Sequence, residues 1–137
     1  MIRGIQIGLV CALLTSFGCG SGDGSLPPVE AESEARRSAM AEVGEMLVFA
    51  KNERGKAPAK AADLAKYAPG LPTGYERVKD GDVVVVWGAP MQEGASDKVI
   101  AYEKAAPESG GYVLMQDGTT VRQMTAEEFK AAPKAGG

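Results

Sequence analysis

The chain has 137 residues, and 15 Lys and Arg against 18 Asp and Glu give it a formal net charge of −3. This length suits one small domain. The chain has no cluster of basic residues of the kind that predicts nucleic-acid binding. The chain has no His, so the commonest general base and metal ligand are missing. Both cysteines lie within the first 19 residues, which leaves no thiol for catalysis or disulfides in the remainder. We therefore expect no enzymatic activity, no metal site and no cofactor.

The first predicted element is an export signal over residues 1–18. Arg3 is the single charge before an apolar run, Ile5–Leu14, and Gly18 ends the segment. A positive start, a short apolar run and a small residue before the cut are the parts of a secretory signal. The run is shorter than the roughly 20 apolar residues that span a bilayer. Its removal would make the remaining chain one charge more negative, because Arg3 is lost.

The end of this signal, Gly18–Cys19, resembles the lipobox of bacterial lipoproteins. In that family a small residue precedes a Cys that is lipidated and becomes the mature N-terminus. The resemblance implies lipidation of Cys19 and a membrane-anchored protein that faces the periplasm or the cell surface. Ser16 and Phe17 depart from the usual lipobox residues. Two alternatives stay open: ordinary cleavage, which gives a soluble exported protein, and an uncleaved anchor.

A flexible spacer is predicted over residues 19–29. Gly and Ser dominate its first half, and two prolines then stiffen the chain. Such a spacer would hold a lipid-anchored domain away from the membrane. We assign one domain to residues 30–132 and a disordered tail to residues 133–137.

A long amphipathic helix is predicted over Glu30–Asn52. Apolar side chains recur at three- and four-residue spacing, and Gly55 is a suitable stop. The stripe consists of Met40, Val43, Leu47 and Ala50, with Met46 and Phe49 flanking it. A stripe that contains Met could dock a partner helix, but the spacing favours a core face.

A short second helix, Ala61–Tyr67, and a loop over residues 70–74 are predicted next. Tyr75–Val78 and Val83–Trp87 are predicted to be strands joined at Asp80-Gly81, because Asp-Gly between β-rich runs is typical of a hairpin. The four consecutive valines, Val83–Val86, predict a central strand covered on both faces.

The last third predicts more sheet. The expected elements are a strand at Val99–Glu103, a loop at Ala105–Gly111, a hairpin of Tyr112–Gln116 with Thr120–Met124 around Asp117-Gly118, and a short helix through Ala131. Thr125 and Glu128 have the spacing of a capping box that would begin this helix. The expected fold is α+β, in which a long N-terminal helix and a short second helix pack on an antiparallel sheet of four or five strands, followed by a short C-terminal helix.

This order of elements resembles the periplasmic headpiece of type II secretion pseudopilins. The segments Val99–Lys104 and Gly110–Met115, followed by Asp117-Gly118 and Val121, are similar to the C-terminal part of the prepilin-type processing-associated family. That family carries a His, then nine intervening residues, then Asp-Gly. The resemblance covers about residues 40–131. It implies an exported, pilin-like protein that acts through contacts with envelope proteins, as an accessory of a secretion or pilus-like system.

The chain departs from that family at three places. Pro107 stands where the family has its His, and Thr119 stands where a second His is often found. The N-terminus lacks the pilin cleavage site and the long apolar helix that packs in a filament core. A lipid anchor and spacer would replace that helix, which indicates a lipoprotein derivative of the family.

Three aromatic residues, Trp87, Tyr102 and Tyr112, are the candidates for a small-ligand or glycan site, which is the alternative function. Trp87 at a strand end is better explained as a cover over the end of the core. Asp80-Gly81 and Asp117-Gly118 are explained by turn geometry rather than by calcium binding. Ser96 and Lys98 are a conceivable Ser-Lys pair, but their polar loop shows no sign of the buried environment that a catalytic Lys needs. No catalytic residue is assigned.

Overall fold

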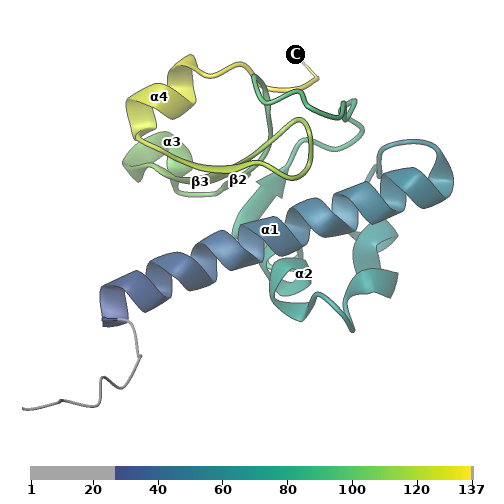
Figure 1. Ribbon diagram of the computed structural model, residues 1–137, viewed down its shortest axis with the longest axis horizontal. Coiled ribbons are helices and arrows are strands. Elements are labelled where there is room, and N and C mark those ends of the chain that lie inside the picture. The colour runs from purple at the N-terminus through teal and green to yellow at the C-terminus, as the bar shows by residue number, and fades with distance from the viewer. Residues whose placement is uncertain (1–26, 137) are drawn as a thin grey trace, which may run out of the picture.

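The computed structural model describes residues 27–136 (Figure 1). The elements, in chain order, are α1 (Pro28–Arg54), the 3-10 helix η1 (Ala61–Tyr67), α2 (Pro72–Lys79), β1 (Val83–Val85), β2 (Val99–Glu103), α3 (Ala106–Ser109), β3 (Gly111–Met115), β4 (Val121–Met124) and α4 (Ala126–Ala131). The four strands form one antiparallel sheet in the order β1-β2-β3-β4. The predicted α+β fold is confirmed. Within the described residues, no helix has the length and apolar character needed to cross a membrane.

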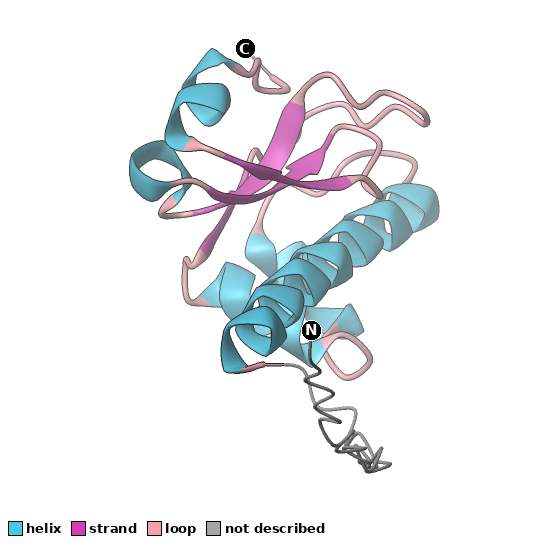
Figure 2. Cartoon of the chain, turned by 60° about the vertical axis from the view of Figure 1, so that its left-hand side comes forward, coloured by secondary structure: helices cyan, strands magenta, loops and turns pink. Residues whose placement is uncertain are grey.

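The sheet lies between two helical layers, with α1 and α2 on one side and α3 and α4 on the other (Figure 2). The larger core joins α1, η1 and α2 to one face of the sheet. A smaller core covers the opposite face and consists of Val99, Ala106, Val113, Met115 and Phe129. Because β2 and β3 are covered on both faces, nearly all their side chains are buried.

Helix α1 buries the predicted stripe. Met40, Val43, Leu47 and Ala50 are all buried in the larger core, as is Met46. The helix begins with a Pro in its first turn and ends where Gly55 adopts a left-handed conformation (φ 70°) and donates its N–H to the Lys51 carbonyl. The stripe is therefore a core face, as the spacing favoured, and Phe49 lies outside it.

Two glycines let α1 approach its neighbours closely. A Cβ at Gly44 of α1 would lie 2.3 Å from the carbonyl oxygen of Gly118, in the turn between β3 and β4. A Cβ at Gly74 of α2 would lie 2.9 Å from the backbone nitrogen of Val43. Backbone therefore packs directly on backbone at both crossings, and α1 is held between the hairpin turn and α2.

The prediction of a strand at Tyr75–Val78 is wrong, because these residues belong to α2. The predicted loop over residues 70–74 is also shorter, since α2 begins at Pro72. The N–H of Gly74 donates to Glu42 of α1 at 2.7 Å, so a side chain distant in sequence satisfies a helix N-terminus. Gly81, with φ 82°, follows the end of this helix and does not turn a hairpin.

The predicted central valine strand is also wrong in two respects. Strand β1 covers only Val83–Val85, and it is an edge strand that pairs with β2 alone. Its burial alternates, with Val84 less buried than its two neighbours. Beyond it, Val86 and Trp87 are partly buried against the larger core without belonging to a strand.

The C-terminal hairpin is confirmed, with β3 and β4 joined through Asp117-Gly118. The capping box is also confirmed: Thr125 accepts the N–H of Glu128, whose side chain accepts the N–H of Thr125. The predicted loop at Ala105–Gly111 is wrong in part, because Ala106–Ser109 form the short helix α3. Pro107 lies in its first turn, a position that needs no backbone donor.

The expectation of a disordered tail is wrong for residues 133–136. Lys134 forms a parallel bridge with Val99, and Ala135 is fully buried. The backbone N–H of Val99 donates to the Pro133 carbonyl, and the N–H of Ala135 donates to the Val99 carbonyl, each at 2.9 Å. The tail thus covers the start of β2, where β1 no longer pairs with it.

Candidate functional site

The three aromatic candidates do not share one groove. Tyr102 packs on Phe129 at a ring distance of 4.7 Å, on the face covered by α3 and α4. Tyr112 is buried on the opposite face, and its hydroxyl lies 2.6 Å from the Ser33 hydroxyl. Trp87 is half-buried against the larger core. Gly18 and Cys19 lie outside the described residues.

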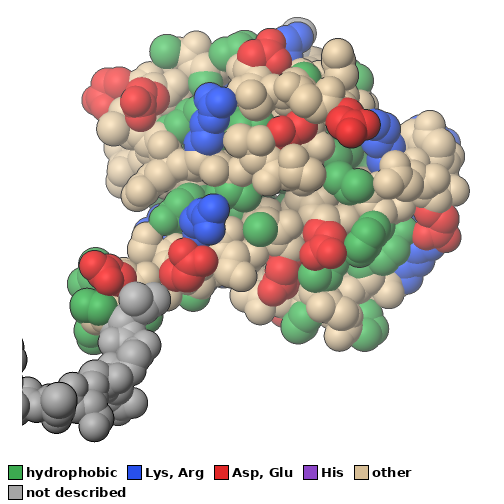
Figure 3. All heavy atoms as spheres, in the orientation of Figure 1, with side chains coloured by type: hydrophobic (Ala, Val, Ile, Leu, Met, Phe, Trp, Pro, Cys, Tyr) green, Lys and Arg blue, Asp and Glu red, His purple; other side chains and the backbone are tan. Residues whose placement is uncertain are grey.

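A surface at the C-terminal end of α1 exposes aromatic rings. Phe49 is 45% exposed, and its ring lies 5.8 Å from that of Tyr67 in η1. Leu71 completes what we call the aromatic surface, and the three residues line a shallow hollow of about 350 Å³. Figure 3 shows hydrophobic side chains gathered near this end of the molecule. Sequence reasoning placed Phe49 beside the stripe, but it could not show that Tyr67 would lie next to it.

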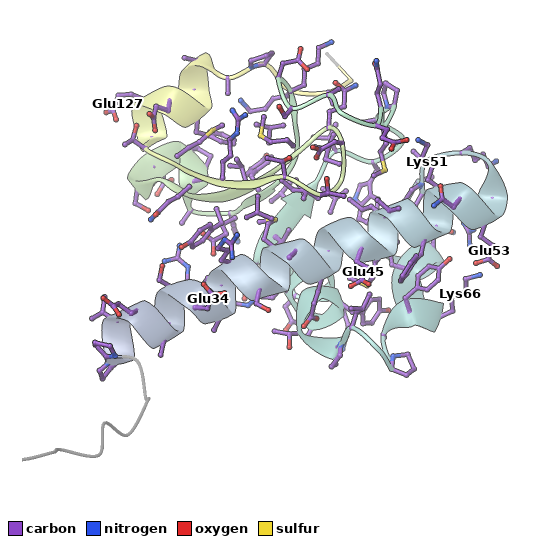
Figure 4. The ribbon with its side chains drawn as sticks, viewed as in Figure 1. Glu34, Glu45, Lys51, Glu53, Lys66 and Glu127 are labelled. Carbon is purple, nitrogen blue, oxygen red and sulfur yellow. The ribbon has the colours of Figure 1, made fainter. Side chains whose placement is uncertain are left out.

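Charged residues surround the aromatic surface and hold η1 in place. Lys66 pairs with Glu53, and the Tyr67 hydroxyl donates to Glu53 at 2.6 Å. The hydrogen bond from Lys66 lowers the pKa of Glu53, and the bond to Glu53 raises the pKa of Tyr67. Figure 4 shows Glu45 and Glu53 on α1 and Lys66 on η1 around this end of the helix. The surface therefore has an apolar centre and a charged rim.

A second pairing fixes η1 to the end of α1. Arg54 lies 2.8 Å from Asp63, which also accepts the backbone N–H of Ala59 at 2.9 Å. The hydrogen bond from Arg54 lowers the pKa of Asp63. These contacts position Tyr67 next to Phe49, because η1 cannot slide along α1 without breaking them.

Near the other end of α1, Arg36 joins the helix to the sheet through an ion pair with Glu103. Its Nε donates to Oε1 of Glu103 at 2.8 Å, and Glu103 Oε2 also accepts the N–H of Tyr112 at 2.7 Å. Burial acts to raise the pKa of Glu103, but the bonds from Arg36 and Tyr112 outweigh it, so this pKa lies below its ordinary value. A Cβ at Gly111 would lie 2.6 Å from Glu103 Oε2, so a larger residue there would displace this carboxylate from its present position.

Two open hollows lie beside the Arg36–Glu103 ion pair, and Arg36 and Glu108 line both of them. The first, of about 630 Å³, lies between α1, the β3 start and the β4 end; its lining also includes Ser109, Gly110, Gly111, Gln123, Met124, Thr125, Ala126, Glu127 and Glu128. The second, of about 500 Å³, is further lined by Arg77, Asp82, Glu103, Lys104 and Ala105. No sequence motif indicated either hollow, because distant segments form them.

Among residues 27–136, no three Asp, Glu, His or Cys side chains lie close enough together to hold a metal ion. Comparisons of the chain with protein-family models, with curated proteins and with solved structures found no match. The aromatic surface is the candidate site that this geometry supports best.

Proposed function

We propose that this chain is a lipid-anchored cell-envelope protein that acts through protein contacts, without enzymatic activity, and that a partner binds the aromatic surface. The observation that carries the proposal is the exposed Phe49 ring next to Tyr67, with charged residues around both. Aromatic anchors inside a polar rim are typical of the residues that dominate binding energy in protein interfaces.

The position of this surface fits a tethered protein. Helix α1 rises about 1.5 Å per residue, which places Phe49 about 30 Å along the helix from Pro28. The predicted lipid anchor and spacer precede Pro28. An anchored molecule would therefore attach at one end of α1 and present its aromatic surface toward the other.

The order of elements supports a role as an accessory of a secretion or pilus-like system. A long helix, a turn that contains Pro58, a short helix and an antiparallel meander occur in the order expected of a pseudopilin headpiece. Helices α2 and α3 were not part of that expectation.

The test is a crosslinked pull-down from intact envelopes with the native chain and with Phe49→Ala. Val29→Ala is the matched control, because Val29 is 80% exposed but lies at the other end of α1. We expect a specific partner with the native chain and with Val29→Ala, and its loss with Phe49→Ala. Pseudopilins or secretion components among the captured proteins would support the accessory role. Equal capture by all three chains would contradict the proposal.

Binding of a small ligand or a glycan is the alternative, and it has less support because Tyr102 and Tyr112 lie on opposite faces of the sheet. The emission of Trp87, the single Trp in the chain, tests it directly. A saturable shift on addition of cell-wall fragments, absent from free N-acetyltryptophanamide, would favour the alternative over the aromatic surface.

A further inference from the structure

The outer edge of β4 presents unpaired backbone groups. Met115 donates its N–H to the Thr120 carbonyl, so in this antiparallel pair Arg122 and Met124 also bond toward β3. The intervening residues, Val121 and Gln123, direct their N–H and C=O groups away from the sheet. Within residues 27–136, no further strand pairs with β4.

This edge is accessible between the two helical layers. In Figure 1 the yellow-green β4 runs along the front of the molecule, between α1 and α4. Arg122 and Gln123 are exposed. Figure 3 shows the same face, which is creased between the two layers. An edge strand of this kind is a ready template for another strand.

The first hollow lies at the end of the same strand. Gln123, Met124 and Thr125 contribute to its lining from β4 and the residue that follows, and Ser109 and Gly110 face them from α3 and its end. Its volume of about 630 Å³ is ample for a long side chain. An extended peptide places alternate side chains on the same side, so a segment paired with β4 would direct side chains into this space.

The charges of the hollow favour a cation. Its single basic side chain, Arg36, is already bonded to Glu103. Glu108, Glu127 and Glu128 also line the hollow; the carboxylate of Glu128 accepts the backbone N–H of Thr125, and Glu127 is labelled on α4 in Figure 4. A Lys or Arg side chain would therefore meet an excess of acidic residues there.

We propose that the edge of β4 accepts an extended segment of a partner protein as an additional strand, and that a Lys or Arg side chain of this segment occupies the hollow beside Glu108 and Glu127. The inference rests on the proposed role in protein contacts, but it concerns a different surface from Phe49. Backbone hydrogen bonds would supply affinity, and the acidic hollow would supply specificity.

A second copy of the chain fits this edge poorly. Antiparallel pairing of β4 with its own copy would bring the two Arg122 side chains opposite or diagonal to each other. It would also bring together two hollows of the same negative charge. Like charges across a strand pair are destabilising, which favours a basic partner over self-association.

The test is selection of peptides from a random phage-displayed library against the full chain purified in detergent. Gln123→Pro is the main variant, because Pro removes only an outward N–H at this position and is tolerated on strand edges. Gln123→Ala is its matched control, since it keeps that N–H. Glu108→Gln with Glu127→Gln tests the charge without any change to the backbone.

We expect enriched peptides that alternate in polarity and carry a Lys or Arg. Their Kd should rise about tenfold with Gln123→Pro, by the loss of one backbone bond, and remain nearly unchanged with Gln123→Ala. The chain with Glu108→Gln and Glu127→Gln should lose the preference for basic peptides. Because its backbone is unchanged, this variant still tests the proposal if Gln123→Pro does not fold. Hydrogen exchange at Val121 and Gln123 should slow when a selected peptide binds.

Three results would overturn the inference. These are no enrichment of basic peptides, binding that Gln123→Pro leaves unchanged in a folded chain, and a dimer in sedimentation that Gln123→Pro dissociates. The last result would assign the edge to a second copy. Phe49→Ala should leave the selected peptides bound, because Phe49 lies on a different surface. Failure of the proposal for the β4 edge is therefore distinguishable from failure of the proposal for the aromatic surface, which the pull-down tests.

Discussion

Arg36 of α1 and Glu103 of β2 form a two-pronged ion pair across the boundary between the N-terminal helix and the sheet, with Nε and Oε1 2.8 Å apart. The carboxylate side chain is only 9% exposed, whereas that of Arg36 is 33% exposed. The ring of Tyr112 lies 5.6 Å below the guanidinium carbon. Because the first three turns of α1 bury little else, this pair is the main attachment of that part of the helix.

Replacement of Arg36 by Met should lower the free energy of unfolding by about 1–3 kcal/mol, because Glu103 would be left buried without its cation. The exposure of Arg36 places the effect below that of a fully buried pair. Arg37→Met is the matched control, since Arg37 and Glu34 form a surface pair 3.6 Å apart. Urea denaturation of the three chains checks this. If both variants lose the same free energy of unfolding, the Arg36–Glu103 pair contributes no more to stability than a surface pair does.

The same pair predicts a pH dependence. The folded pKa of Glu103 lies below its ordinary value of 4.5, so its contribution to stability is present above about pH 4.5 and is lost as pH falls through the folded pKa. Glu103→Gln should therefore flatten part of the acid decline in unfolding free energy between pH 5 and pH 2. Glu53 and Asp63 titrate in both chains, so the difference between the two curves isolates Glu103. Parallel curves would contradict this assignment.

Gly44→Ala should destabilise the protein by about 1–3 kcal/mol, although Ala is the better helix former by about 1 kcal/mol. The reason is that the new Cβ would lie 2.3 Å from the Gly118 carbonyl oxygen. Gly70→Ala is the control, because its nearest neighbour, the Tyr67 oxygen, lies at 3.8 Å. Thermal unfolding of both variants tests the contact. A more stable Gly44→Ala chain would show that α1 and the hairpin turn do not touch there.

Deletion of residues 134–137 should lower the free energy of unfolding by about 2 kcal/mol, through the loss of backbone and side-chain hydrogen bonds. The segment contributes the bond from Ala135 to Val99, and the Lys134 ammonium donates to the Phe129 and Ala132 carbonyls at the end of α4. Deletion of Gly137 alone is the control. If both truncations unfold at the same urea concentration, residues 134–136 contribute nothing to stability.

Cys19→Ser should move the protein from the membrane fraction to the soluble fraction, because the proposed lipid would no longer be attached. Fractionation of cells followed by immunoblotting checks this, with Ser21→Ala as the control in the same spacer. Membrane retention of Cys19→Ser without detergent would assign the attachment to another segment.

The sequence by itself determined the elements whose signals are local. The spacing of Met40, Val43 and Leu47 predicted the buried face of α1, because a helical repeat needs no knowledge of the partner. Asp117-Gly118 predicted the β3–β4 turn, and Thr125 with Glu128 predicted the start of α4, since each motif satisfies its own backbone groups.

Only the tertiary structure decided the elements that depend on distant contacts. Tyr75–Val78 has the composition of a strand, but Glu42 holds the N-terminus of α2 and Val78 packs into the core, so the segment is helical. Gly81 then ends a helix where the same residues could have turned a hairpin, because glycine serves both conformations. The edge position of β1 and the burial of Ala135 likewise depend on which segments lie beside β2. The aromatic surface and the hollow beside β4 join residues far apart in the chain, and a one-dimensional pattern carries no such distances.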